Sequence, residues 1–316
     1  MNPAKQQLSN LSETEDLHIH LALSQDRAAD DASSPPMPLP PNTTPVPNPV
    51  FMPGMSHQTE APAATTPTPT PSSKDQSTSV ATTPTFDLPR LRLHIQEINH
   101  PGSSVFLSAI NASTVLKTSI ESIYKYLYLS TSTPTSRPYP PPPTRSVTLI
   151  LRPMDGVAYT TGSDLDPEHK EIHFSLPYIS TITPPTRQTS EITGIITHEL
   201  VHCYQHTGRG FAPSGLIEGV ADWVRLQCEL APPHWNPAEV PAKWDAGYQH
   251  TAYFLQYLED RFGAGTVPRL NEKLRTDKYV EKAFWTELVG GPVEQLFKDY
   301  IKTLQKDGDK CCVELS

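Results

Sequence analysis

Cysteines, clusters of basic residues and long apolar runs are all scarce in this chain of 316 residues. Its four cysteines (Cys203, Cys228, Cys311 and Cys312) lack the spacing of a disulfide framework, which favours a reducing compartment. A disulfide between Cys203 and Cys228 is the alternative. Acidic residues outnumber basic ones by 34 to 25, and no run of lysine and arginine appears. We therefore expect neither nucleic acid nor an anionic membrane as a partner.

No segment approaches the roughly 20 apolar residues that a membrane-spanning helix needs. Residues 1–25 are polar and include Glu13, Glu15 and Asp16, where a secretory signal would have a basic start followed by an apolar core. These two absences predict a soluble, cytoplasmic protein, with an extracellular location as the alternative. We also expect it to be a monomer.

Proline, in contrast, is abundant where large apolar residues are rare. Of the 35 prolines, 15 precede Thr85, and residues 33–85 consist largely of Pro, Thr, Ser and Ala. Such a segment cannot bury enough apolar surface to offset the entropy lost on ordering. We expect residues 1–85 to be a disordered extension, residues 86–305 to form one folded domain, and residues 306–316 to be a flexible tail.

Apolar periodicity in the remaining chain predicts an α+β domain, in which a small mixed sheet packs on helices. The six prolines of residues 131–144 predict an exposed loop. Ser214 is a plausible N-cap for the helix that follows it. Strands are expected at 86–99, 146–151 and 171–179, and helices at 103–129, 189–207, 215–230, 244–262, 267–275 and 293–305.

Two histidines four residues apart, His198 and His202, flank Glu199 in the helix expected at 189–207. Residues i and i+4 lie on one helix face, so both imidazoles can bind one metal ion beside the glutamate. This pattern is typical of zinc hydrolases, in which Glu199 would take a proton from zinc-bound water. The pattern has only three fixed letters, so the surrounding sequence must support it.

That support comes from Glu218, sixteen residues after His202. Catalytic zinc needs three protein ligands and one exchangeable water, and a carboxylate from a second helix completes the set. Asp222 lies one turn after Glu218, where it can accept the other ring N–H of a ligand histidine. His206 is the rival third ligand. Gln205 occupies the position at which the HExxHxxGxxH pattern requires glycine, which argues against that class.

Amide hydrolysis also needs a hydrogen-bond donor for the oxyanion that forms on the carbonyl. Tyr248, His250 and Tyr253 cluster after the metal helices, and we take Tyr248 as the first candidate and His250 as the second. The strand expected at 171–179 precedes the metal helix. A peptide substrate could add to that edge of the sheet through backbone hydrogen bonds.

Three motifs resemble the plant basic secretory protein family, a group of zinc peptidases from plants, bacteria and fungi: residues 196–202 (ITHELVH), residues 215–226 (GLIEGVADWVRL) and residues 244–248 (WDAGY) followed by Thr251-Ala252. The resemblance covers most of residues 91–300. It implies a zincin-like, more narrowly gluzincin-like, metallopeptidase fold. It also implies zinc bound by His198, His202 and Glu218, Glu199 as the base, and Tyr248 near the site.

Two departures from that family concern location and role. Its plant members are usually secreted and basic, whereas this chain is acidic and carries a long N-terminal extension. The leading hypothesis is a zinc-dependent metallopeptidase acting on a peptide or protein substrate. A non-catalytic zinc-containing binding or defence-type protein is one alternative, against which the intact Glu199 argues. A zinc hydrolase of non-peptide amides or esters is the other.

Overall fold

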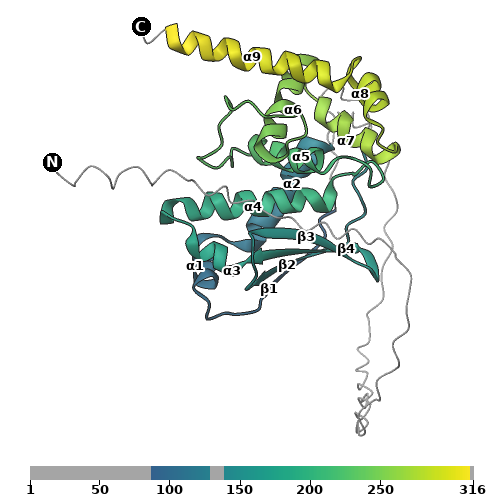
Figure 1. The fold of residues 1–316 in the computed structure, drawn as a ribbon. Helices are drawn as coiled ribbons and strands as arrows, with labels where there is room; N and C mark the ends of the chain where they lie inside the picture. The colour runs from purple at the N-terminus through teal and green to yellow at the C-terminus, as the bar shows by residue number, and fades with distance from the viewer. Residues whose placement is uncertain (1–86, 129–138, 314–316) are drawn as a thin grey trace, which may run out of the picture. The chain divides into compact units, whose positions relative to one another are not determined.

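The computed structural model describes residues 87–128 and 139–313, with side chains up to residue 305 (Figure 1). These residues belong to one compact unit. The expected disorder of residues 1–85 and the first part of the expected loop, residues 131–138, lie outside the described residues. Residues 139–145 have no regular structure, as the prolines predict. Across the described ranges, no helix is both long and apolar enough to cross a membrane.

A four-stranded sheet has the order β1-β2-β4-β3. Its first three strands, β1 (Arg90–Ile95), β2 (Ser146–Arg152) and β4 (Asp166–Ser175), are parallel. The edge strand β3 (Ala158–Ser163) is antiparallel to β4. Leu149 of β2 pairs with Ile172 of β4, and both side chains are fully buried on one face. The α+β class with a mixed sheet is confirmed.

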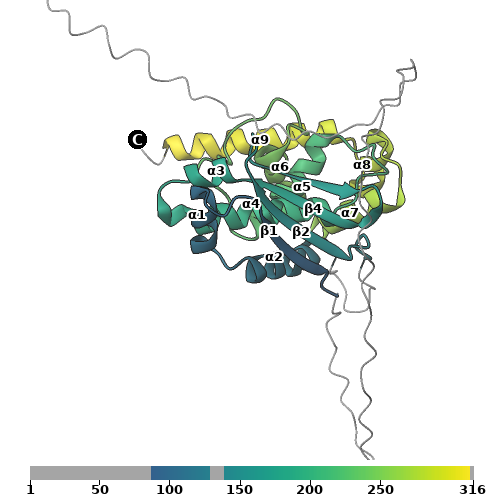
Figure 2. The ribbon, with the colours of Figure 1, turned by 90° about the horizontal axis from the view of Figure 1, so that it is seen from below.

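Helices cover the apolar face of this sheet. Helix α2 (Ala112–Leu127) packs against helix α4 (Gln188–Tyr204), and both contact the sheet. Figure 1 shows the two helices above the strands, and Figure 2, seen from below, shows the strands in front of them. Helix α4, which carries the histidine motif, is therefore held between the sheet and the remaining helices.

The strand expected at 171–179 ends at Ser175 instead. The Ser175 hydroxyl accepts the N–H of Tyr178 at 3.2 Å, and Pro177 fits the first turn of a helix, so the chain continues as α3 (Leu176–Thr181). Strand β3 was not expected at all. Its sequence, Ala-Tyr-Thr-Thr-Gly-Ser, lacks the alternation of apolar and polar residues that signals a strand.

The single helix expected at 103–129 is two helices, α1 (Pro101–Ala109) and α2. Asn111 separates them because its side chain accepts the N–H of Thr114 at 3.1 Å and caps a new helix. The apolar spacing continues through this break, so periodicity alone does not reveal it.

A short 3-10 turn, η1 (Pro185–Arg187), leads into α4, and α5 (Ser214–Gln227) follows. Ser214 is the first helical residue and Pro213 occupies the cap position, which corrects the expected serine cap. Cys203 and Cys228 are free thiols, so the alternative disulfide does not form in this structure.

The C-terminal part is helical, as expected, but with different boundaries. Helix α6 (Tyr248–Phe262) begins four residues later than predicted, after Gly247 with a φ of 91°. Helix α7 (Thr266–Thr276) matches the prediction closely, and α8 (Glu281–Val289) was not predicted. Helix α9 (Val293–Val313) continues through most of the segment expected to be a flexible tail.

Candidate metal centre

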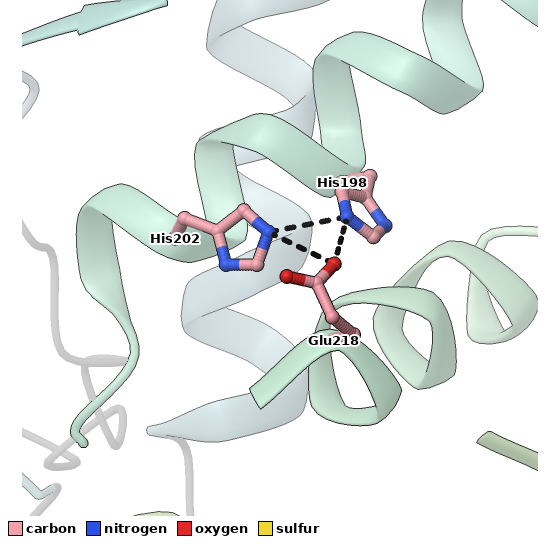
Figure 3. A group of neighbouring side chains, drawn as sticks. All are labelled: His198, His202 and Glu218. Carbon is pink, nitrogen blue, oxygen red and sulfur yellow. Dashed lines mark hydrogen bonds and ion pairs between the residues drawn. The ribbon is translucent and has the colours of Figure 1, made fainter. Parts of the chain in front are cut away.

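Three predicted ligands converge between α4 and α5. The Nε2 atom of His198 lies 3.1 Å from Nε2 of His202 and 3.1 Å from Oε2 of Glu218. The remaining distance, from His202 Nε2 to Glu218 Oε2, is 3.6 Å. Figure 3 shows both rings and the carboxylate directed at one point. His198 and Glu218 are buried and His202 is half-buried, so the histidines and the glutamate form a compact set at the border of the core.

Each histidine is also contacted at its other ring nitrogen. His198 Nδ1 lies 2.6 Å from Oδ1 of the buried Asp222. An ionised carboxylate only accepts hydrogen bonds, so Nδ1 of His198 carries a proton and Nε2 faces the glutamate. His202 Nδ1 lies 2.5 Å from the side-chain amide of Gln205. Asp222 therefore lies in contact with a predicted ligand histidine, and the contact of Gln205 was not foreseen.

The carboxylates around the three side chains favour a positive charge at their centre. Burial lowers the pKa of His198, but the Asp222 and Glu218 carboxylates outweigh it and raise the pKa to about 10. Burial raises the pKa of Glu218, but the hydrogen bonds from His198 and His202 bring it well below its usual range. The surroundings therefore stabilise positive charge at the centre of the three side chains.

The donor set fits a divalent metal. Two imidazole nitrogens and one carboxylate oxygen are the ligand types that zinc takes in hydrolases, and their ligand atoms all lie within 4.8 Å of one another. A cation at their centre would replace the protons that otherwise keep these groups together. His198, His202 and Glu218 could therefore hold such an ion.

The Glu199 side chain contacts the edge strand β3. It is buried, with 3% of its surface exposed. The Thr160 hydroxyl on β3 lies 2.7 Å from Glu199 Oε2 and 2.9 Å from the main-chain oxygen of Glu199. Its single proton can be donated to either acceptor. Sequence reasoning missed Thr160 because it missed β3, although the position of Thr160 opposite Ile172 places it on the helix-covered face.

Tyr248 lies beside the histidines, at the first turn of α6. Its ring stacks on that of His198, with centroids 6.2 Å apart and planes inclined by 16°. Its φ is 46°, in the left-handed region that non-glycine residues seldom occupy and that is often found at functional sites. Burial raises the pKa of Tyr248, and the charges of Glu218, Asp222 and Glu199 raise it further. The phenol therefore keeps its proton and remains a donor.

Two glycines of α5 let the start of α6 come this close. A Cβ atom on Gly215 would overlap the main-chain oxygen of Asp245, and one on Gly219 would overlap the side chain of Thr251. The Thr251 hydroxyl accepts the N–H of Gly247 at 2.9 Å and donates to the Trp244 oxygen at 3.0 Å. The motifs at 215–226 and 244–252 therefore form two sides of one contact.

A family model described as peptidase of plants and bacteria, BSP, matches residues 88–300. The match covers about two thirds of the chain and includes the whole sheet, the converging histidines and Glu218. The chain belongs to this BSP family. No curated protein and no solved structure gives a significant match. The resemblance seen in the sequence motifs is thus confirmed.

The other candidates from the sequence lie elsewhere in this BSP-family domain. His250 makes an ion-pair contact with Glu239 at 3.8 Å, and the ring of Tyr253 packs edge-on against Trp235. His206, the rival ligand, packs its ring against Tyr128. Among the described side chains, the group that could hold a metal contains Glu218 and not His206.

Proposed function

We propose that this chain is a zinc-dependent metallopeptidase that hydrolyses peptide bonds through a zinc-activated water. The observation that carries the proposal is the convergence of His198, His202 and Glu218, with Glu199 between the two histidines in sequence. These three side chains would hold a zinc ion, which would supply Lewis acidity and lower the pKa of a bound water toward neutrality. Membership of a peptidase family supports the same reaction.

The chain's own residues then have distinct tasks. Glu199 accepts a proton from the attacking water and returns it to the leaving amine. Tyr248 donates a hydrogen bond to the oxyanion, a role supported by its stacking on His198 and its retained proton. Asp222 holds the His198 ring in the tautomer that presents Nε2. Thr160 holds the Glu199 carboxylate at the edge strand.

The edge strand supports a peptide as the substrate. Strand β3 ends the sheet on the side of Glu199, and β4 is its partner strand within the described residues. An extended peptide can pair with such an edge through main-chain hydrogen bonds. We therefore propose that the substrate pairs with β3, rather than with the strand at 171–179 that the sequence suggested. A zinc hydrolase of other amides or esters would have no use for such pairing.

The decisive test is Glu199→Gln in the full chain, assayed against a broad peptide library. Glutamine keeps the shape of glutamate but cannot act as the base, so we expect about one equivalent of zinc and a loss of cleavage of roughly 10²–10⁴-fold. Metal analysis and cleavage with and without a chelator measure both. The exposed Glu121→Gln on α2 is the matched control and should cleave at the wild-type rate.

Each contrary outcome has its own meaning. Equal cleavage by the wild-type and Glu199→Gln proteins would exclude Glu199 as the base. Zinc at wild-type levels in a Glu218→Ala protein would exclude Glu218 as a ligand. If both proteins hold zinc and neither cleaves any peptide, the protein is better described as a zinc-containing binding protein.

A further inference from the structure

The side chain of Gln205 reaches back to the metal centre from just beyond the end of α4. Its amide lies 2.5 Å from His202 Nδ1, and 6% of the residue is exposed. The other polar atom of the amide, Oε1, is buried and has no hydrogen-bond partner among the described residues. Burying an amide with one polar atom unpaired costs free energy, so its single short contact with the imidazole calls for a functional explanation.

The backbone explains how Gln205 gets there. It is the C-cap of α4, with an extended conformation (φ −75°, ψ 157°), and its N–H still bonds to the Val201 oxygen at 2.7 Å. The chain leaves the helix at this residue, so its side chain can fold back over His202, three positions earlier. No left-handed turn is needed, which is consistent with glutamine where another class of zinc peptidase requires glycine.

The two histidines thus have different partners. Asp222 on α5 contacts Nδ1 of His198, and Gln205, the C-cap of α4, contacts Nδ1 of His202. A histidine that binds a metal through Nε2 must carry its proton on Nδ1, and a group that accepts this proton fixes both the tautomer and the ring orientation. Aspartate can only accept, whereas an amide offers an oxygen acceptor and an N–H donor on opposite sides.

We infer that Gln205 is the positioning residue of His202, the counterpart of Asp222 for His198. The inference rests on the proposed zinc site. When Nε2 of His202 binds a metal, the Gln205 amide presents its oxygen to Nδ1–H of His202. In the structure the amide nitrogen of Gln205 is the nearer atom, so this arrangement requires a half-turn of the amide. The half-turn pairs the amide oxygen with Nδ1–H and moves the amide nitrogen to the position that the oxygen leaves. Oxygen and nitrogen of an amide have nearly the same shape, so this half-turn needs no extra space.

Zinc affinity of the full chain, measured by competition with a chromogenic chelator, tests the inference without any peptide substrate. Gln205→Met keeps the length of the side chain and removes the acceptor, and should weaken zinc binding by roughly 10–100-fold. Gln205→Glu keeps the acceptor and should bind zinc at least as tightly as the wild type. The matched control is Gln188→Met, a half-buried glutamine at the start of α4 whose amide bonds to Ile182 and not to the site.

The outcomes separate this inference from the proposed function. A wild-type protein that takes up no zinc overturns the proposed function, and the inference with it. Zinc binding by the wild type and equal affinity of Gln205→Met overturn the inference alone. A merely structural role would lower the thermal midpoint of Gln205→Met and leave its zinc affinity unchanged. If that variant does not fold, Gln205→Glu decides, because a tenfold loss of affinity with the acceptor retained contradicts the assignment.

Discussion

At the scale of single residues, the site depends on hydrogen bonds from outside the histidine motif. Asp222 and Gln205 contact the histidines, and Thr160 contacts Glu199. They come from α5, from the end of α4 and from β3, so the three elements must be in place before the proposed ligands and the proposed base are oriented. A general base works only when it is held within hydrogen-bond reach of the proton it takes.

Thr160→Val tests whether the Thr160 hydroxyl orients Glu199, the proposed base, because valine keeps the branched shape and removes the hydroxyl. A hydrogen bond to a charged group contributes about 1.5–3 kcal/mol, which corresponds to roughly 10–100-fold in rate. We expect kcat for peptide cleavage to fall by about this factor with KM and zinc content unchanged, and Thr160→Ser to restore it.

The matched control for Thr160 is Thr161→Val. Thr161 is the next residue of β3, points to the opposite face and bonds only to the neighbouring Gly162 oxygen among the described contacts. It should leave kcat unchanged. Equal kcat in the Thr160→Val and wild-type proteins would show that Glu199 is oriented by other contacts.

At the scale of elements, the sequence predicts best those helices in which the apolar residues and the proposed metal-site residues follow the same helical spacing. The helical spacing of His198 and His202, and of Glu218 and Asp222, is visible in the letters, and the structure brings these four side chains together. Helices α4 and α5 were predicted to within a few residues at each end. A local pattern suffices here because each pair lies on one helix face.

The elements that the sequence did not predict are those specified by contacts between distant residues. Strand β3 is polar, and it is a strand because it pairs with β4, which no local pattern encodes. Tyr248 was a candidate through its position after the metal helices and through the family resemblance of residues 244–248. What places it is the pair of α5 glycines, whose missing side chains admit Asp245 and Thr251. A sequence shows where a glycine lies, but it does not show which neighbouring atom fills the space that a side chain would take.

Gly219→Ala tests this contact. In an exposed helix, replacing glycine with alanine stabilises by about 0.5–1 kcal/mol, but here the new methyl overlaps the fully buried Thr251. Overpacking of this kind costs about 1–3 kcal/mol, so we expect net destabilisation in urea unfolding, together with lower peptidase activity as Tyr248 moves. Gly291→Ala is the control, since a methyl there meets nothing within 4 Å. Unfolding midpoints that are equal for Gly219→Ala and the wild type would contradict the close contact.

At the scale of the whole molecule, every residue of the proposed site lies within the family match. Thr160 is the first along the chain and Tyr248 the last, and the match spans residues 88–300. Among the side chains that the structure describes, the buried apolar ones also lie between Phe106 and Tyr300. We therefore propose that residues 86–305 are the catalytic domain and that the Pro/Thr/Ser-rich residues before them are not required for its fold.

Deleting residues 1–83 tests that division. The deleted segment has too few large apolar residues to contribute to a core, so its removal should take no buried apolar surface from the domain. For a domain of this size, a loss of 1 kcal/mol lowers the thermal midpoint by about 2–4 °C, so we expect a change smaller than that, and about one equivalent of zinc. Calorimetry and metal analysis of the shortened and full chains make the comparison. A midpoint lower by several times this amount would show that the N-terminal segment packs on the domain, and a loss of zinc with an unchanged midpoint would show that it acts on the metal centre itself.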